Sequence, residues 1–536
     1  PDHMSILTYF TETGRAPVVA KNGMAATSHP SATDVAIEIL KAGGNAMDAA
    51  VAACAVQCVV EPQSTGIGGD CFSIYAPNGG IKYHAYNGSG RAPAAASLSW
   101  FKEQNINEFG EKSPHAVTVP GAVDAWTQLI NDHGRMHLSE LLIPAIKMAK
   151  DGYEILPRVG TDFFHKREYL DPLSPAGKVF MPNGVMAEIG DIHHQPLLAN
   201  TLESIGGEGR DGFYQGAVAQ DIVSHLKQLG GLHTLDDFSG ARGNYVTPIS
   251  ANYKGYDVFQ CPPNGQGIIA LMLLKLMERF EREGVSPLEA RRIHQEIEAG
   301  RLTYHFRDAY LADPDKVNVP VDEMLSDQTI DRFYKAIGDK RIDTLSEYEL
   351  PDHQDTVYIS VVDKDRNCAS FINTLFMAFG SGIMAPKSGV LLQNRGRGFS
   401  MQDGHPNVIA GGKRPLHTII PGMVAKNGRT VMPFGVMGGA YQAFGHMQFL
   451  SRFLDYGYDI QQSMDMARFF PNPVTGEVEV EPDIDALITE DLINRGHKVV
   501  SAPIPTGGSQ AIWIDYENGT LTGGSDPRKD GYAKGY

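Results

Sequence analysis

A threonine at the head of an alternating apolar segment constrains this chain more than any other feature. Residues 355–363 read DTVYISVVD and follow a polar stretch at 347–355. The alternation predicts a strand. A cut just before Thr356 would begin this strand with a residue that carries both a nucleophilic hydroxyl and its own amine base. Many strands also begin with threonine after an Asp-rich loop, so the segment alone leaves an ordinary strand start open.

The residues around this segment predict layers of helices and strands. Residues 361–367 predict a strand end and turn, and 368–374 the returning strand of a hairpin. Asn45 is expected to cap an alanine-rich helix that packs closely on a sheet. Further helices are predicted at 33–42, 122–132, 138–150, 216–229, 268–283 and 288–312, and hairpins at 71–86 and 510–523. Helices before and after two sets of strands indicate a layered α/β fold.

Composition limits the partners of the chain. Hydrophobic residues make up 42% of its 536 residues, which is enough for a large core. No apolar run approaches the roughly 20 residues of a membrane helix, so we expect no membrane partner. The net charge of −17 disfavours nucleic acid.

Two features bear on the cellular compartment. The five cysteines form no CxxC pair, and their odd number argues against a disulfide framework. Residues 1–3 look like a cloning remnant, and no Lys/Arg-led apolar segment follows Met4, so we expect a cytoplasmic protein.

Short motifs recur along the chain in a fixed order. They are GGNAMDAA (43–50), GIGGD (66–70), VPG (119–121), LIPAIKMA (142–149), GGL (230–232), DPD (313–315), FGSG (379–382), SGVLLQN (388–394), KRPL (413–416), VMGG (436–439) and GSDPR (524–528). With the hairpin that begins at Thr356, they resemble the γ-glutamyltransferase family of self-cleaving N-terminal-nucleophile (Ntn) hydrolases over residues 18–536.

This resemblance implies a fold and a maturation step. The fold would be a four-layer αββα sandwich of the α/β (α+β) class. Thr356 would attack the Asp355 carbonyl and divide the precursor into a large subunit, 1–355, and a small subunit, 356–536, within one structural domain. The two subunits would remain partners, and the resemblance also allows a dimer of processed heterodimers.

The resemblance also implies the catalytic residues. The freed α-amine of Thr356, with a reference pKa of about 7.7–8.0, would take the hydroxyl proton. Thr374 matches the family's second threonine, which hydrogen-bonds the nucleophile. Gly438 and Gly439 would present backbone N–H groups to the oxyanion, and a side chain there would block its approach.

The binding residues depart from the family pattern. Gly398 stands where transferases have the aspartate that binds the substrate ammonium group. Other replacements are Arg395 for a glutamine, Phe376 for an asparagine, His417 and Thr418 for two serines, and Ser89 for the carboxylate-binding arginine, with Arg91 two residues later. The predicted substrate-binding residues are Arg91, Arg395, Arg397, His417 and Thr418. Arginine suits a carboxylate, although Arg395 and Arg397 could instead bridge surface carboxylates.

These departures favour one function over two others. The pattern resembles the family branch of oxamate amidohydrolases and glutaryl-cephalosporin acylases, so we expect a small amide substrate whose acyl part carries a carboxylate. A γ-glutamyltransferase (glutathione hydrolase) with a rebuilt pocket and an uncleaved, non-catalytic homologue remain the alternatives.

Other chemistries have weaker signals. The chain has no HExxH or Gly-x-Ser-x-Gly motif, and strand-like residues, not a helix, follow 66–69. His193 and His194 are expected to be solvated, so we predict no metal and no cofactor.

Overall fold

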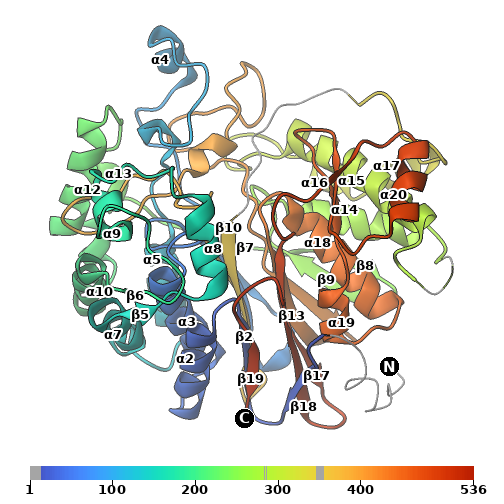
Figure 1. Cartoon of the computed structure of the whole chain (residues 1–536), viewed down its shortest axis with the longest axis horizontal. Coiled ribbons are helices and arrows are strands. Elements are labelled where there is room, and N and C mark those ends of the chain that lie inside the picture. Colours follow the sequence, from blue (N-terminus) through green and yellow to red (C-terminus); the bar gives the residue numbers. More distant parts are fainter. Residues whose placement is uncertain (1–13, 283, 285, 346–354) are drawn as a thin grey trace.

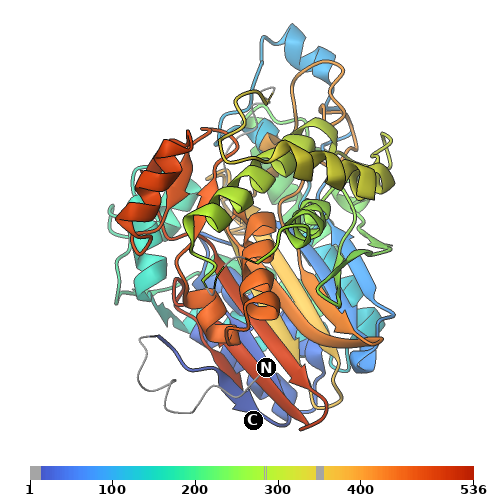
Figure 2. The same ribbon diagram turned by 90° about the vertical axis from the view of Figure 1, so that its right-hand side faces the viewer.

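The computed structural model describes residues 14–536 apart from 283, 285 and 346–354, and describes only the backbone of Asp355. Two seven-stranded antiparallel sheets lie face to face between two layers of helices (Figures 1 and 2). The predicted four-layer αββα fold is confirmed.

Each large sheet draws strands from both sides of residue 355. The first runs in the order β1 (Val18–Ala20), β18 (Thr520–Ser525), β17 (Gly508–Asp515), β13 (Arg429–Met437), β12 (Gly422–Lys426), β9 (Tyr256–Gln260) and β8 (Ile249–Tyr253). The second runs β19 (Ala533–Gly535), β2 (Met24–Thr27), β10 (Asp355–Val362), β11 (Cys368–Phe376), β3 (Asp70–Ala76), β4 (His84–Gly88) and β7 (Asn244–Val246). Two small sheets contain β14 (Phe469–Pro471), β15 (Val478–Val480) and β16 (Val499–Ser501), and β5 (Tyr153–Glu154) and β6 (Ile192–His193).

Helices cover the outer face of each large sheet. The second sheet carries α2 (Pro30–Lys41), α3 (Ala46–Val60) and α5 (Ala122–His133); the first carries α14 (Gly267–Glu278), α18 (Tyr441–Leu450) and α19 (Ile460–Asp465), with α15 (Ala290–Tyr310) packed on α14. Further helices are α4 (Leu98–Glu103), α6 (Leu138–Leu141), α7 (Ile143–Asp151), α8 (Pro157–His165), α9 (Pro175–Phe180), α10 (Pro196–Glu208), α11 (Asp211–Tyr214), α12 (Gly216–Gln228), α13 (Leu235–Ser239), α16 (Val321–Met324), α17 (Asp327–Ala336) and α20 (Ala486–Asn494). Among the residues described, none of these helices has the length and apolarity to cross a bilayer.

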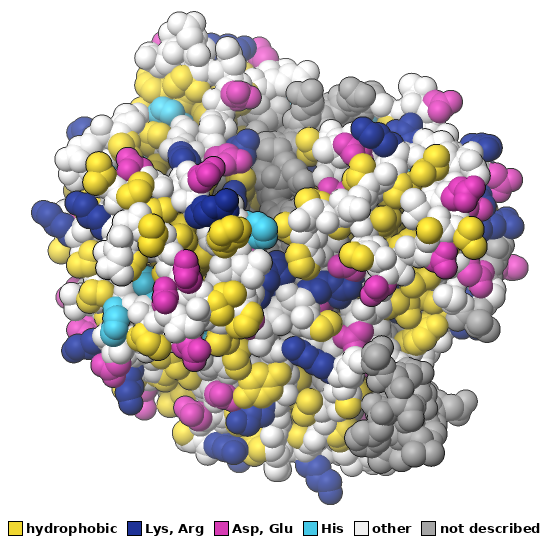
Figure 3. Space-filling view, in the orientation of Figure 1, with side chains coloured by type: hydrophobic (Ala, Val, Ile, Leu, Met, Phe, Trp, Pro, Cys, Tyr) yellow, Lys and Arg dark blue, Asp and Glu magenta, His cyan; other side chains and the backbone are white. Residues whose placement is uncertain are grey.

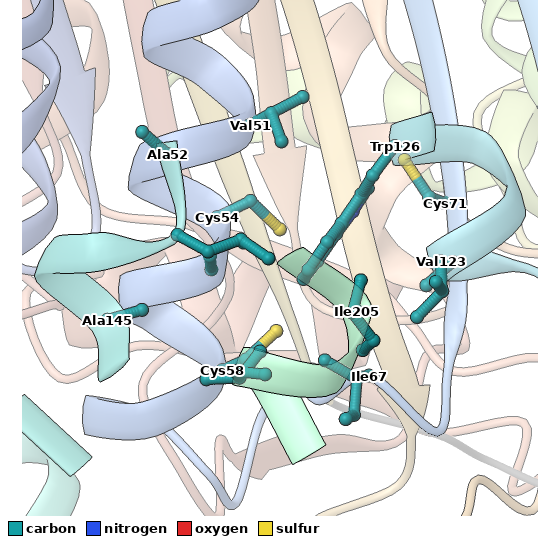
Figure 4. Close-up of a cluster of buried hydrophobic side chains, with 14 of the residues drawn as sticks. Val51, Ala52, Cys54, Cys58, Ile67, Cys71, Val123, Trp126, Ala145 and Ile205 are labelled. Carbon is teal, nitrogen blue, oxygen red and sulfur yellow. The ribbon is translucent and has the colours of Figure 1, made fainter. Parts of the chain in front are cut away.

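Helix α3 forms as the sequence predicts. Asn45 caps it by accepting from the Asp48 N–H, and the Asp48 side chain accepts from the Asn45 N–H in return. All fifteen of its residues are buried, and its alanines let it lie close to β10 and β11. Figure 4 shows Trp126 and Ile205 among the side chains around Cys54 and Cys58 of this helix.

Two predicted helices differ from those observed. The segment 138–150 forms two helices, α6 and α7, that meet at Leu142, because Pro144 cannot donate to the preceding turn and instead lies in the first turn of α7. The helix predicted at 268–283 ends at Glu278, where the apolar residues that face the core run out and charged residues follow.

Strand β10 is buried on both faces, and the strand period decides which residues face the other sheet. Ile359 and Val361 pack with α3, whereas Tyr358 and Val362 pack with side chains of the first sheet. Thr356 has the same parity as Tyr358, so its side chain points between the sheets, towards the end of β13.

The glycines of 66–70 let backbones approach closely. A Cβ atom at Gly68 would lie 2.0 Å from the Leu391 carbonyl oxygen, and one at Gly69 would lie 1.9 Å from that of Thr374. Both distances are far below van der Waals contact, so these positions exclude any side chain.

We expect Gly69→Ala to destabilise the protein by about 2 kcal/mol or more, because its methyl group would displace the strand that carries Thr374. Gly207→Ala is the matched control, since nothing lies within 4 Å of its Cβ position on α10. The Tm of Gly69→Ala should fall clearly in thermal unfolding, while that of Gly207→Ala stays near the parent value. Equal Tm values for the two variants would contradict this account.

Candidate active site

Thr356 lies at the start of β10 with its side chain enclosed. It is 1% exposed, and the pairing of β10 with β11 shifts register between Asp355 and Val357. Its Oγ1 atom lies 3.5 Å from the Gly438 backbone nitrogen and 3.1 Å from the side-chain amide of Gln442. The irregular register therefore sets this threonine apart from an ordinary mid-strand residue.

The Gly438–Gly439 turn joins the end of β13 to the start of α18. Both residues have positive φ, +124° and +57°, a conformation that glycine adopts readily. The Gly438 N–H points at Thr356 Oγ1, and the positive end of the α18 dipole lies beside it. The turn thus supplies donors where negative charge would develop, and its oxyanion role stays a prediction.

Thr374 and Phe376 end the neighbouring strand β11. The Thr374 hydroxyl accepts from the Phe376 N–H at 2.8 Å, and the Thr374 carbonyl packs against Gly69. Phe376 has φ +86°, and its ring covers the guanidinium of Arg395 with 3.7 Å between the Arg395 Cζ atom and the ring centroid. Thr374 lies across the register shift from Thr356, in the region that the family resemblance assigns to it.

Arg395 is the most unusual charge near the site. It is 0% exposed, Nη1 donates to Thr418 Oγ1 at 2.9 Å, and Nε has no partner within the described part of the chain. No described carboxylate lies within ion-pair distance of it. Burial lowers the pKa of Arg395 to about 9, and the negative charge of Asp70 offsets this lowering only in part. A guanidinium with five donors and one such bond has the capacity to bind an anion.

His417 is paired with Asp70 behind Arg395. His417 Nε2 and Asp70 Oδ2 are 2.8 Å apart, and both side chains are fully buried. Burial first, and the charge of Arg395 second, lower the pKa of His417 to about 4, so the ring is neutral near pH 7 and donates to Asp70. The other Asp70 oxygen accepts from the Gly90 N–H, the Gly121 N–H and the Gln393 amide. The His417–Asp70 pair thus connects the segments that form this side of the site.

Arg91 and Arg397 lie in different surroundings. Arg397 donates to the Phe109 carbonyl at 3.1 Å and lies 3.7 Å from Glu111 Oε1. Arg91 lies 4.0 Å from Asp313 Oδ2 and lines a separate cavity of about 210 Å³. The structure brings Arg395 and Thr418 together, but within the described residues none of Arg91, Arg395 and Arg397 contacts Thr356 directly. Their roles in binding stay predictions.

A small cavity opens directly onto Thr356. Its volume is about 30 Å³, and Gly438, Tyr441 and Phe470 line it together with residues 503–507. Arg158, Lys529 and Glu479 supply its charges. Lys and Arg side chains also gather around the hollow in the middle of the face shown in Figure 3.

Sequence reasoning missed three residues of this site: Gln442, Arg158 and Lys529. The one available signal was for Gln442, because it follows the Gly438–Gly439 turn by three residues and so enters the first turn of a helix. Arg158 and Lys529 belong to segments far apart in the chain, and nothing local marks them.

The histidines give one correction and one possible ligand set. His193 is buried in β6 against the Tyr153 hydroxyl and the Val179 carbonyl, so the expectation of a solvated residue was wrong for it, while His194 is exposed. Within the described residues, His294, Glu298 and His497 place ligand atoms within 4.8 Å of one another. The two rings, however, bond each other at 2.8 Å, and Glu298 accepts from an arginine. Burial first, then His294 and nearby arginines, lower the pKa of His497 to about 3, and this positive surrounding disfavours a cation.

The family follows from a match over nearly the whole chain. Residues 32–536 match the family model described as gamma-glutamyltranspeptidase. The chain belongs to the γ-glutamyltranspeptidase family. It is 35% identical to the glutathione hydrolase-like YwrD proenzyme of Bacillus subtilis, over 97% of this chain and 99% of that protein. It is 30% identical to the oxamate amidohydrolase proenzyme of Klebsiella pneumoniae, over 97% and 99%.

A solved structure agrees with this assignment. The cephalosporin acylase of Bacillus halodurans superposes with a TM-score of 0.91 at 35% identity, covering all of this chain and 99% of that one. The predicted family, Ntn fold and enzyme class are therefore confirmed: the chain is a γ-glutamyltranspeptidase-family hydrolase that acts on amide bonds.

We expect Thr356→Ala to remain a single chain without activity, because it removes the attacking oxygen. The parent protein should give fragments of 355 and 181 residues on a denaturing gel, which stay associated under native conditions because each large sheet contains strands from both. Thr430→Ala, which removes another buried strand threonine, should still cleave. Cleavage of Thr356→Ala at the same bond would refute the assignment of the nucleophile.

Proposed function

We propose that this protein is a self-processing N-terminal-threonine amidohydrolase that cleaves a small amide whose acyl part carries a carboxylate. The observation that carries the proposal is Arg395, a fully buried guanidinium with one hydrogen bond and no described carboxylate partner. Burying a charge without a partner is costly, and a substrate carboxylate would supply that partner.

Arg395 is linked to the nucleophile through two residues. Its guanidinium donates to the Thr418 hydroxyl, the Thr418 carbonyl is 3.1 Å from the Gln442 amide, and the same amide reaches Thr356 Oγ1. A carboxylate bound near Arg395 would therefore hold a short acyl group within reach of the threonine.

The site also lacks the group that a γ-glutamyl substrate needs. Gly398 replaces the ammonium-binding aspartate, and a Cβ atom there would lie 2.7 Å from the Leu416 carbonyl oxygen, so the backbone leaves no room for that side chain. Phe376 and His417 are larger than the asparagine and serine that they replace. An α-ammonium group would therefore lack the aspartate that binds it in the transferases, and would have less space.

The cavity at Thr356 supports a small anionic substrate. Arg158 and Lys529 place two cationic groups on its wall beside Glu479, and Arg158 is also paired with Asp162 at 2.9 Å. A volume of about 30 Å³ corresponds to about two water molecules. In the uncleaved chain, this cavity is large enough for a group the size of a carboxylate.

The chemistry would proceed in two stages at the same hydroxyl. In maturation, Thr356 Oγ1 attacks the carbonyl carbon of residue 355, the C–N bond breaks as its nitrogen takes the proton, and water hydrolyses the resulting ester. In turnover, the freed α-amine takes the hydroxyl proton while Oγ1 attacks the substrate amide. Gly438 and Gly439 face the oxyanion, the proton passes to the leaving nitrogen, and water releases the acid.

The relatives support this proposal and its main alternative. Oxamate amidohydrolase and cephalosporin acylase are names of amide hydrolases outside γ-glutamyl transfer, whereas the YwrD proenzyme is described as glutathione hydrolase-like. A γ-glutamyltransferase is therefore the second candidate.

We expect glutaryl p-nitroanilide to be cleaved faster than γ-glutamyl p-nitroanilide, which differs from it only by the α-amine. Oxamate should release ammonia, and glycylglycine should hardly raise turnover of the γ-glutamyl compound. Release of p-nitroaniline and of ammonia measures these rates. A strong acceptor-dependent rate would instead identify a transferase, and absence of both cleavage products on a gel would identify a non-catalytic homologue.

We expect Arg395→Ala to lower kcat/KM for a carboxylate-bearing amide by about 30- to 900-fold, since a charged hydrogen-bonded contact contributes about 2–4 kcal/mol. The rate for a neutral acyl amide and the cleavage at Thr356 should change little. Arg452→Ala is the control, because Arg452 is also buried but donates to the carbonyls of Met466 and Ala467. If the parent hydrolyses neutral and anionic acyl amides equally well, the preference for a carboxylate is absent.

A further inference from the structure

The Gln442 side chain is in hydrogen-bond contact with the predicted nucleophile, and neither the motifs nor the relatives assign it a role. It lies in the first turn of α18, is 0% exposed, and its amide is 3.1 Å from Thr356 Oγ1. We infer that Gln442 is a positioning residue that orients the Thr356 hydroxyl for attack. The inference rests on the proposed role of Thr356.

The surroundings decide which way the amide points. With its oxygen towards Thr356, that oxygen accepts from the Thr356 hydroxyl at 3.1 Å and from the Gly439 N–H at 3.3 Å. The amide nitrogen then donates to the carbonyls of Thr418 at 3.1 Å and Val436 at 3.2 Å. The opposite orientation gains one bond from Ile420 at 3.3 Å but turns the oxygen towards two carbonyl oxygens. The first orientation satisfies all four polar capacities of the amide.

This orientation has a chemical consequence. Before attack, the single hydroxyl proton lies in the bond to Gln442, which fixes the direction of both Oγ1 lone pairs. That proton then passes to the amide nitrogen in maturation and to the α-amine in turnover. The same amide holds the Gly439 N–H of the oxyanion turn and the carbonyl of Thr418, whose hydroxyl contacts Arg395. Gln442 therefore sets the attacking oxygen relative to the oxyanion donors and the anion-binding arginine at once.

A purely structural role would predict something different. Other buried glutamines also bond within the core; Gln260 on β9, for example, lies 2.9 Å from His446 of α18. Removing such a bond lowers stability without changing the geometry at Thr356. The two roles can therefore be separated by comparing rates with stability.

The test uses Gln442→Met, which keeps the length of the side chain and removes its hydrogen bonds. We expect self-cleavage, followed on denaturing gels, and kcat to fall about 10- to 100-fold, with KM within about twofold of the parent. Gln260→Met is the matched control, a loss of the same amide against the same helix, and should keep kcat within about twofold. If the two variants lose kcat equally for an equal loss of Tm, or if Gln442→Met keeps the parent rates, the inference is wrong.

Gln442→Glu gives an independent readout in pH. A protonated carboxyl can still accept from the Thr356 hydroxyl and donate to one carbonyl, whereas the ionised form turns negative charge towards the carbonyls of Thr418 and Val436. Self-cleavage should therefore be fastest at low pH and decline as pH rises through the pKa of the introduced carboxyl. An unchanged pH profile would overturn the inference even if Gln442→Met fails to mature. Continued cleavage of Thr356→Ala would refute the nucleophile itself, a separate outcome.

Discussion

The site depends on the burial of β10 on both faces. α3 covers one face and the strands of the first sheet cover the other, so every residue of the strand from Val357 on is committed to one side. A slip of one residue would turn Thr356 towards α3 and away from the Gly438–Gly439 turn. Packing over the whole strand therefore fixes the direction of a single hydroxyl at its end.

The buried carboxylate of Asp70 fixes the part of the site around Arg395 and His417. Asp70 accepts from the loops at Gly90 and Gly121, from Gln393 and from His417, so one side chain joins four segments far apart in the sequence. Asp70 forms no ion pair with Arg395, and its charge offsets the effect of burial on the pKa of Arg395 only in part. The arginine therefore keeps its capacity for an anion.

The sequence predicted those features that local pattern controls. The cap at Asn45 and the hairpin that begins at Thr356 each follow from a few adjacent residues, and the structure contains both. Contacts between distant segments could not be predicted in this way. The partners of Arg91 and Arg397, the burial of His193, and the meeting of Gln442 with Thr356 all depend on how separate elements pack. The family resemblance supplied the expected site positions, and Gln442 was not among them.

Two departures from the family pattern, at Gly398 and Arg395, change the charge of the site in the same direction. At the position where the family resemblance places the ammonium-binding aspartate, the backbone at Gly398 is too close to Leu416 for an acidic side chain, and Arg395 adds a positive charge nearby. Phe376 adopts positive φ and lays its ring over that guanidinium, which shields the charge from water on one face. An aromatic face attracts a cation but leaves its in-plane N–H donors available. The edge of Arg395 that carries those donors is therefore where a carboxylate would gain most, and the loss of the acidic group removes its competitor.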